Sequence, residues 1–196
     1  MKLSRISLFL VALSMSTAMF AQMDHKAAAA PPTEAQKSFT AIKALAGQWE
    51  GPVTLNPPMN GSDFAHIRVS MRVTSRGNAL VHEMNEAGKP EDPAKYDHPV
   101  TMIYLDGDQL NLVHYCDAGN RPHMTGKVSP DGKKVEFDFV DLSGSNKFGH
   151  MFHAVFTMID ADHHSEDWTY MMPGDKPMKA HMDLQRKKDA TSVAGQ

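Results

Sequence analysis

One histidine and the only cysteine of the chain lie two residues apart in the segment "HYCDAGNRPHM", residues 114–124. Residues two apart in a β-strand point to the same face, so His114 and Cys116 would share a face if this segment is extended. An imidazole and a thiolate suit zinc or copper, and a thiol beside a basic imidazole can act as a nucleophile. The pair therefore indicates a metal or heme ligand set, a covalent catalyst, or a buried thiol beside a hydrogen-bonded histidine.

The sequence favours the last of these interpretations. Two ligands do not complete a metal site, because structural zinc is held by four, and neither a third catalytic residue nor an oxyanion-binding loop is evident near the pair. Free cysteine is also among the residue types most often buried. We therefore predict no catalytic residue, no metal ligand and no cofactor. Two alternatives stay open: copper, zinc or heme held by His114 and Cys116, and a hydrolase or isomerase that uses the same pair.

The other histidines and methionines raise the question of copper again. The chain holds 15 Met and 11 His, and several are neighbours, as in "HEM" and "HMFH". Adjacent residues of a strand face opposite sides, so each such pair offers at most one ligand to a given side. Methionine also fills irregular core space well. We expect methionines in the core and histidines on strand surfaces.

Three glutamates, Glu50, Glu83 and Glu166, are embedded in apolar segments. Two carboxylates at about 5–10 Å could perform general acid–base chemistry, but spacing along the chain does not establish such a distance. We expect these groups to be hydrogen-bonded or to face solvent.

The first 21 residues are typical of a secretory signal peptide. Lys2 and Arg5 form a basic start, Leu8–Leu13 form an apolar run too short to span a bilayer, and small residues precede a cleavage site after Ala21 or Ala18. The sequence thus predicts export to the periplasm or the extracellular space. No later apolar run is long enough for a membrane helix, so no integral membrane segment is expected.

Charge and cysteine content exclude other classes. Cleavage after Ala21 lowers the basic count from 20 to 18 against 23 acidic residues, which gives a net charge of −5. A mildly acidic chain without a basic block is not expected to bind nucleic acid. The single cysteine cannot form an internal disulfide, so the fold must depend on its core. The sequence does not determine the oligomeric state.

The mature chain is expected to form one domain over residues 33–187. A low-complexity linker over 22–32 precedes it, and a flexible tail over 188–196 follows it. Thr33 and Gln36 have capping-box spacing and begin one amphipathic helix, which Gly47 ends as a left-handed stop. Alternating apolar residues between regular turn sequences then predict strands at about 49–55, 64–74, 79–85, 99–105, 109–116, 123–128, 133–140, 149–159, 163–171 and 178–186.

Ten consecutive strands joined by short turns predict an all-β fold, an antiparallel up-and-down β-barrel with one short N-terminal helix. Closure removes exposed strand edges, which suits a chain without disulfides. Alternation places His114 and Cys116 on the interior side. The other rows that share a face are Thr101, Ile103, Leu105, Leu110 and Leu112; Phe152, Ala154, Phe156 and Met158; and His164, Glu166, Trp168 and Tyr170.

Two end segments resemble a known superfamily. "LAGQWEG", residues 45–51, and "LQRKK", residues 184–188, are similar to the Gly-x-Trp signature and the last strand of the lipocalin-like calycin barrels. The resemblance implies that Trp49, which follows Gly47, closes one end of the barrel beneath Arg186. A guanidinium over an indole is a cation–π contact, and its other donors can bind backbone carbonyls.

A more specific resemblance is to an uncharacterised bacterial lipocalin-like family, a domain of unknown function. Its members carry "LAGxWEG", "DGDxLxLxHYCxxGNxPRM" and a late "eW" strand, and this chain has "LAGQWEG", "DGDQLNLVHYCDAGNRPHM" and "EDWTY". The resemblance covers residues 38–187 and differs at Arg121 and His123, where glutamine and arginine are expected. It implies a fold and no established activity.

Nitrobindin-like barrels, which are also calycin-like, place a heme-ligating histidine late in the chain. His181 is the late histidine here, but it shares its strand face with Lys179 and Asp183. A face with these charges is expected to lie outside the barrel, which argues against heme at this position.

These observations predict an exported lipocalin-like barrel that binds a small, partly apolar molecule in its cavity. A barrel of this size can also be packed solid with side chains. If a cavity exists, four polar groups are expected to orient the ligand: His114, Cys116, Tyr104 and Asn120.

Overall fold

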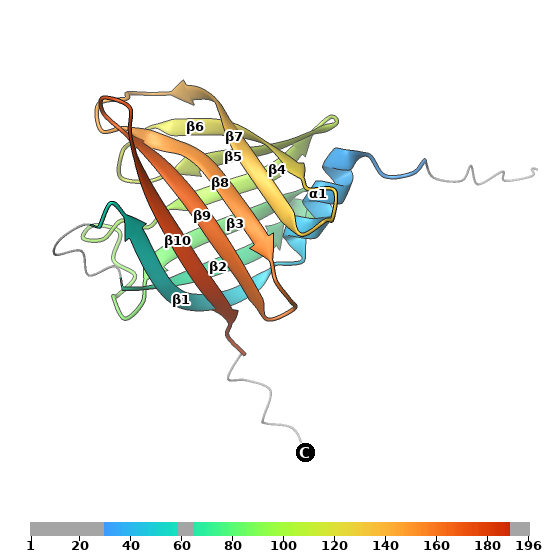
Figure 1. The fold of residues 1–196 in the computed structure, drawn as a ribbon, viewed down its shortest axis with the longest axis horizontal. Coiled ribbons are helices and arrows are strands. Elements are labelled where there is room, and N and C mark those ends of the chain that lie inside the picture. The colour runs from blue at the N-terminus through green and yellow to red at the C-terminus, as the bar shows by residue number, and fades with distance from the viewer. Residues whose placement is uncertain (1–29, 59–64, 189–196) are drawn as a thin grey trace, which may run out of the picture. The chain divides into compact units, whose positions relative to one another are not determined.

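A computed structural model of the chain describes residues 30–58 and 65–188. The predicted signal peptide, nearly all of the predicted linker and nearly all of the predicted tail lie outside these residues. The described chain forms one helix and ten antiparallel strands in a closed barrel (Figure 1). The elements are α1 (Glu34–Lys43), β1 (Gly47–Asn56), β2 (His66–Thr74), β3 (Ala79–Glu86), β4 (Val100–Asp106), β5 (Gln109–Tyr115), β6 (Arg121–Val128), β7 (Lys134–Ser143), β8 (His150–Met158), β9 (His163–Met172) and β10 (Lys176–Arg186), with a short 3₁₀ turn at Ser75–Gly77.

Each strand pairs with its sequence neighbours, and β1 closes the barrel by pairing with β10. The predicted up-and-down barrel is therefore confirmed. Strand boundaries fall within three residues of those that alternation predicts, because side chains alternate between a buried interior and an exposed exterior along each strand. In β5, for example, Leu110, Leu112 and His114 are buried and face inward.

The N-terminal helix covers one end of the barrel, where it packs against β4 to β7 (Figure 1). Thr33 accepts a hydrogen bond from the Gln36 amide, and the Gln36 side chain accepts one from the Thr33 amide, so the predicted capping box is present. Phe39 and Ile42 are the buried apolar residues that hold the helix to the barrel. Among the described residues no helix has the length and apolar character needed to cross a membrane.

Gly47 has a different role from the predicted helix stop. The helix ends at Lys43, and its last carbonyls accept short-range bonds from the amides of Ala44, Leu45 and Ala46, so no left-handed residue is needed to end it. Gly47 is instead the first residue of β1, with φ of +144°. A Cβ on this residue would collide with the Arg186 guanidinium, so glycine leaves room for that side chain.

The same end of the barrel is closed by Trp49 and Arg186, which are paired across β1 and β10. The guanidinium carbon lies 4.0 Å from the indole centroid, and the Trp49 Nε1–H donates to the Leu45 carbonyl at 2.8 Å. Arg186 also donates to the carbonyls of Ala46 at 2.8 Å and Ala161 at 2.9 Å. This end, with α1 and the turns around it, is called the closed end below.

One predicted interior row is wrong at its first residue. Phe152 was expected inside with Ala154 and Phe156, but it is 38% exposed and Met151 is buried in its place. The pairing of β8 with β9 shifts by one residue between Met151 and His153. A bulge of this kind reverses the alternation on one side of it, which simple periodicity does not reveal.

Candidate functional site

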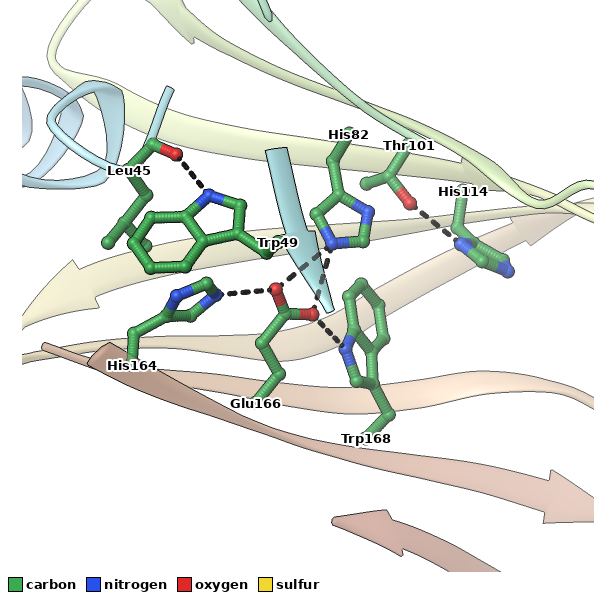
Figure 2. A network of polar contacts seen from close by, with 8 residues as sticks. All are labelled: Leu45, Trp49, His82, Thr101, His114, His164, Glu166 and Trp168. Carbon is green, nitrogen blue, oxygen red and sulfur yellow. Dashed lines mark hydrogen bonds and ion pairs between the residues drawn. The ribbon is translucent and has the colours of Figure 1, made fainter. Parts of the chain in front are cut away.

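A buried carboxylate lies at the centre of the polar interior. Glu166 in β9 is fully buried and accepts three hydrogen bonds, all from ring nitrogens (Figure 2). Its donors are Nε2 of His82 at 3.0 Å, Nε2 of His164 at 3.0 Å and Nε1 of Trp168 at 2.8 Å. Because His82 lies in β3 and the others in β9, the carboxylate joins two strands that are not neighbours in the sheet.

The donors keep this carboxylate ionised. Burial alone would raise the pKa of Glu166, but the nearby His82 and the bonds from His164 and His82 hold it well below its usual value. Each Nε2 donates to the carboxylate, and the Nδ1 atoms of both histidines are buried without a partner in the described chain. The edge of His164 also meets the Trp49 ring, with centroids 4.1 Å apart. This network, Glu166 with His82, His164 and Trp168, is called the carboxylate network.

His114 lies beyond this network, away from the closed end (Figure 2). Its Nδ1 is hydrogen-bonded to the Thr101 hydroxyl at 2.8 Å, and the residue is 1% exposed. Burial, with a smaller contribution from the nearby His82, lowers the pKa of His114 to about 3. The ring is therefore neutral near pH 7, and its Nε2 forms no hydrogen bond with any residue that the structure describes.

His114 lines a cavity of about 520 Å³ at the end of the barrel opposite the helix. A second cavity of about 240 Å³ adjoins it and shares Met84, Asp97 and four other lining residues with it. The two together are called the chamber. The chamber walls are mostly apolar and rich in methionine, with Met84, Met151, Met178, Met182, Trp168 and Ala180 among their residues.

The mouth of the chamber carries Asp97, Cys116 and Asp117. One ligand atom from each of these three residues lies within 4.8 Å of the others, so the group could hold a metal ion. Burial, offset in part by the Ala118 amide, raises the pKa of the Cys116 thiol. No hydrogen bond joins Cys116 to His114 in the described chain, so nothing here activates the thiol as a nucleophile. A second set of side chains that lie close enough together to hold a metal ion is on the outer face of β7 and β8: Glu136, Asp138 and His153.

Two of the four predicted ligand-orienting residues line the chamber and two do not. His114 and Cys116 line it together. Tyr104 is absent from the lining, because it stands between Ile103 and Leu105 on β4 and alternation turns it outward. Asn120 is buried, but its amide donates to the carbonyls of Ser145 at 2.9 Å and Gly149 at 2.7 Å. It fastens the β7–β8 loop and does not line the chamber.

The other candidate residues from the sequence, His181, Glu50 and Glu83, do not line the chamber. His181 is exposed on the outer face and pairs with Asp167 at 2.7 Å, as its charged strand face indicated. Glu50 and Glu83 are only partly buried, and Glu50 pairs with Lys187 at 3.4 Å.

The carboxylate network as a unit is not predicted from the sequence. Alternation places His164, Glu166 and Trp168 on one strand face, and that row is the available signal. His82 belongs to β3, which is four strands away from β9 around the barrel in one direction and six in the other. No local sequence pattern indicates which strand faces β9 across the barrel.

The fold and chamber define a closed ten-stranded antiparallel barrel with an internal cavity. No family model matches this chain, and no curated protein matches it. Among solved structures, it is similar to Rv2717c from M. tuberculosis with a TM-score of 0.55 and 12% identity, over 77% of this chain and 98% of that chain. It is also similar, with a TM-score of 0.41 and 11% identity, to a protein of unknown function from the DUF3598 family of Nostoc punctiforme PCC 73102, over 74% of this chain and 48% of that chain. At 12% identity, the similarity to Rv2717c supports the fold alone. The TM-score of the DUF3598 protein is too low to support a conclusion about this chain.

Proposed function

We propose that this protein is an exported lipocalin-like barrel of the calycin type that binds a small, partly apolar molecule in its chamber. Export to the periplasm or the extracellular space rests on the signal-peptide pattern of residues 1–21. The observation that carries the binding proposal is His114, a buried neutral imidazole that lines the chamber with a free Nε2.

A free polar atom in an apolar cavity is what small-molecule sites provide. Such sites have volumes of about 300–1,000 Å³, mostly apolar walls and a few polar groups that fix the orientation of the ligand. The chamber has a main cavity of about 520 Å³ and walls of methionine, tryptophan and alanine. Methionine side chains adapt to irregular ligands, so these walls can accept an apolar body of more than one shape.

The test is binding of a neutral apolar dye, N-phenyl-1-naphthylamine, measured by its fluorescence. Ala180→Phe would place a ring in the space that both cavities share, and we expect it to weaken dye binding at least tenfold. Lys179→Phe places the same ring on the exposed outer face of the same strand and is the matched control.

Loss of dye binding in Ala180→Phe alone would support the proposal. No dye binding by the wild-type chain, or equal loss in both variants, would contradict it. Native mass spectrometry of the exported protein would then be the direct search for the natural ligand, as an added mass that is retained by Lys179→Phe and lost from Ala180→Phe.

A second candidate function is metal or heme binding at His114 and Cys116. It is favoured by one observation, the close approach of ligand atoms from Asp97, Cys116 and Asp117 at the mouth. Carboxylate and thiolate donors suit zinc better than heme, whose propionates would be repelled by the two acids. Elemental analysis and an absorption scan for a Soret band, both on protein purified from its native compartment, test this candidate; absence of both signals excludes it.

A further inference from the structure

The chamber mouth carries two carboxylates without partners. Asp97 and Asp117 are exposed, and neither forms an ion pair with any lysine, arginine or histidine that the structure describes; Asp97 accepts the Asp117 backbone amide at 3.1 Å. Some other acids on the barrel exterior are paired, such as Asp167 with His181 and Asp183 with His163. The mouth therefore carries two carboxylates without an ion pair beside an apolar chamber.

Together with burial, the negative charges at the mouth raise the pKa values of the groups beside them. Burial and the neighbouring Asp117 raise the pKa of Asp97. Burial raises the pKa of Tyr170 to about 12, with further contributions from Cys116, Asp117 and Asp97. Both shifts would be relieved by a positive charge placed between these groups.

Aromatic rings line the chamber, and of these Tyr170 lies close enough to Asp97 and Asp117 for their charges to raise its pKa. Trp168, Tyr170 and Phe148 belong to its lining, and the Tyr170 hydroxyl donates to the Phe148 carbonyl at 3.0 Å. Aromatic faces attract cations, and rings combined with carboxylates are the usual means of recognising an organic ammonium group. One resident cation already uses this property, because the Lys147 ammonium lies 5.0 Å from the Phe148 ring centroid. His98 lies next to Asp97 in sequence and partly offsets the rise in the pKa of Asp97.

We infer that the chamber selects organic cations: molecules with an apolar body that fills the methionine-lined space and an ammonium group that lies between Asp97, Asp117 and the aromatic rings. This inference rests on the proposed function, and it specifies the ligand class. A metal ion at the mouth is less well supported, because it would require the Cys116 thiol to ionise where burial opposes ionisation, and because closed metal sites use four ligands. His114 lies deeper and is free to bond a polar group on the apolar body.

The test compares three compounds with one naphthyl body and different head groups: (2-naphthylmethyl)trimethylammonium, 2-naphthylmethanol and 2-naphthylacetate. Equilibrium dialysis of the full-length mature protein, treated with EDTA beforehand, measures each affinity. We expect the cation to bind about tenfold more tightly than the alcohol, and the anion to bind most weakly. The preference should fall as salt is added, since the mouth is open to solvent.

Matched variants locate the effect. Asp97→Asn with Asp117→Asn should remove the preference for the cation, so that the affinities for the cation and the alcohol become about equal, because the amides keep the shape of the mouth and lose its charge. Asp106→Asn with Asp108→Asn changes the net charge equally in the turn between β4 and β5, at the closed end, and should keep the preference.

The outcomes distinguish a failure of the proposed function from a failure of the inference about organic cations. If none of the three compounds binds, the proposed function fails together with the inference. If the alcohol binds and the cation is not preferred, or if the Asp97 and Asp117 variant keeps the preference, the inference alone is overturned. A cation preference seen only when EDTA treatment is omitted would assign the mouth to a metal ion and overturn the inference as well.

Discussion

The two ends of the barrel interior differ in what their charged groups contact. Between the chamber and the closed end, Glu166 accepts three hydrogen bonds, and at the closed end Arg186 donates to two backbone carbonyls while covering Trp49. At the open end, His114 has a free Nε2, and Asp97 and Asp117 have no ion-pair partner among the described residues. Of these groups, the free Nε2 of His114 lies beside the chamber, where a ligand can reach it, and small-molecule sites use such polar atoms to orient their ligands. The comparison assigns stability to one end and binding to the other.

The largest effect should come from removing the carboxylate network. Glu166→Ala leaves two imidazoles and an indole without their acceptor, and we expect a loss of about 5 kcal/mol in the free energy of unfolding. Glu166→Gln keeps one acceptor oxygen and should cost about 3 kcal/mol. Urea denaturation measures both, and exposed Glu91→Gln is the control, with an expected change below about 0.5 kcal/mol. A network variant as stable as the control would remove the structural role given to the network.

The next largest effect should come from the closing pair. Trp49 is 1% exposed, and Trp49→Ala should cost about 4 kcal/mol in unfolding free energy. Arg186→Ala should cost less, and the double variant should be less destabilised than the sum, because the two side chains are in direct contact. The same urea measurements on the four chains of the double-mutant cycle decide this. Strict additivity would mean that the stacking contact contributes nothing.

A smaller effect tests the open end through pH. The pKa of His114 is 6.5 when exposed and about 3 in the fold, so the unfolded chain binds more protons below pH 6.5. Stability must therefore fall as the pH drops from 6.5 toward 3, by about 1.4 kcal/mol per pH unit from this group, which is about 2 kcal/mol at pH 5. His114→Gln should lose this part of the slope.

The range between pH 7.5 and pH 5 separates the contribution of His114 from that of Glu166. The pKa of Glu166 is lowered in the fold, so its contribution is fully present above the unfolded value of 4.5 and is lost only as the pH falls below it. The difference in unfolding free energy between the wild type and His114→Gln, measured at pH 7.5, 6.5 and 5.5, should thus change mainly between the two lower pH values, where the wild type loses stability and the variant does not. Parallel pH dependences over this range would show that His114 is protonated in the fold.

The smallest effect concerns the helix that covers the closed end. Thr33→Ala removes the cap that accepts from the Gln36 amide and should cost about 1 kcal/mol. Thermal unfolding measures it, and Thr40→Ala, whose hydroxyl bonds the Gln36 carbonyl within the helix, is the comparison, with a smaller expected change. Dye binding in the chamber should be unaltered in both variants. A weakened chamber would contradict the separation of the two ends.

Much of the fold follows from local sequence, because alternation and turn residues act over a few positions. The rows through His114 and through Glu166 face the interior as alternation predicts. The exceptions have local physical causes: the bulge at Met151 moves Phe152 outward, and the short-range bonds after Lys43 end the helix before Gly47.

The site is less predictable than the fold. His114 and Cys116 were found from their spacing, whereas Tyr104 was assigned to the ligand although its own strand alternation turns it outward. Asp97 lies in the loop before β4, and its approach to Asp117 across the β3–β4 and β5–β6 loops is set by the closed barrel and by no local pattern. The meeting of His82 with Glu166 is of the same kind. Contacts between distant strands require the register of the whole sheet.

The position of the chain's only cysteine provides a natural attachment point for a reporter group. Cys116 is partly exposed at the chamber mouth, so a thiol-reactive fluorophore would modify one known place in the unmutated protein. Its raised pKa means that labelling should be slow at neutral pH and faster in mildly alkaline buffer. A dye tethered there would sense the entry and exit of molecules as changes in emission and would allow exchange rates to be followed one molecule at a time.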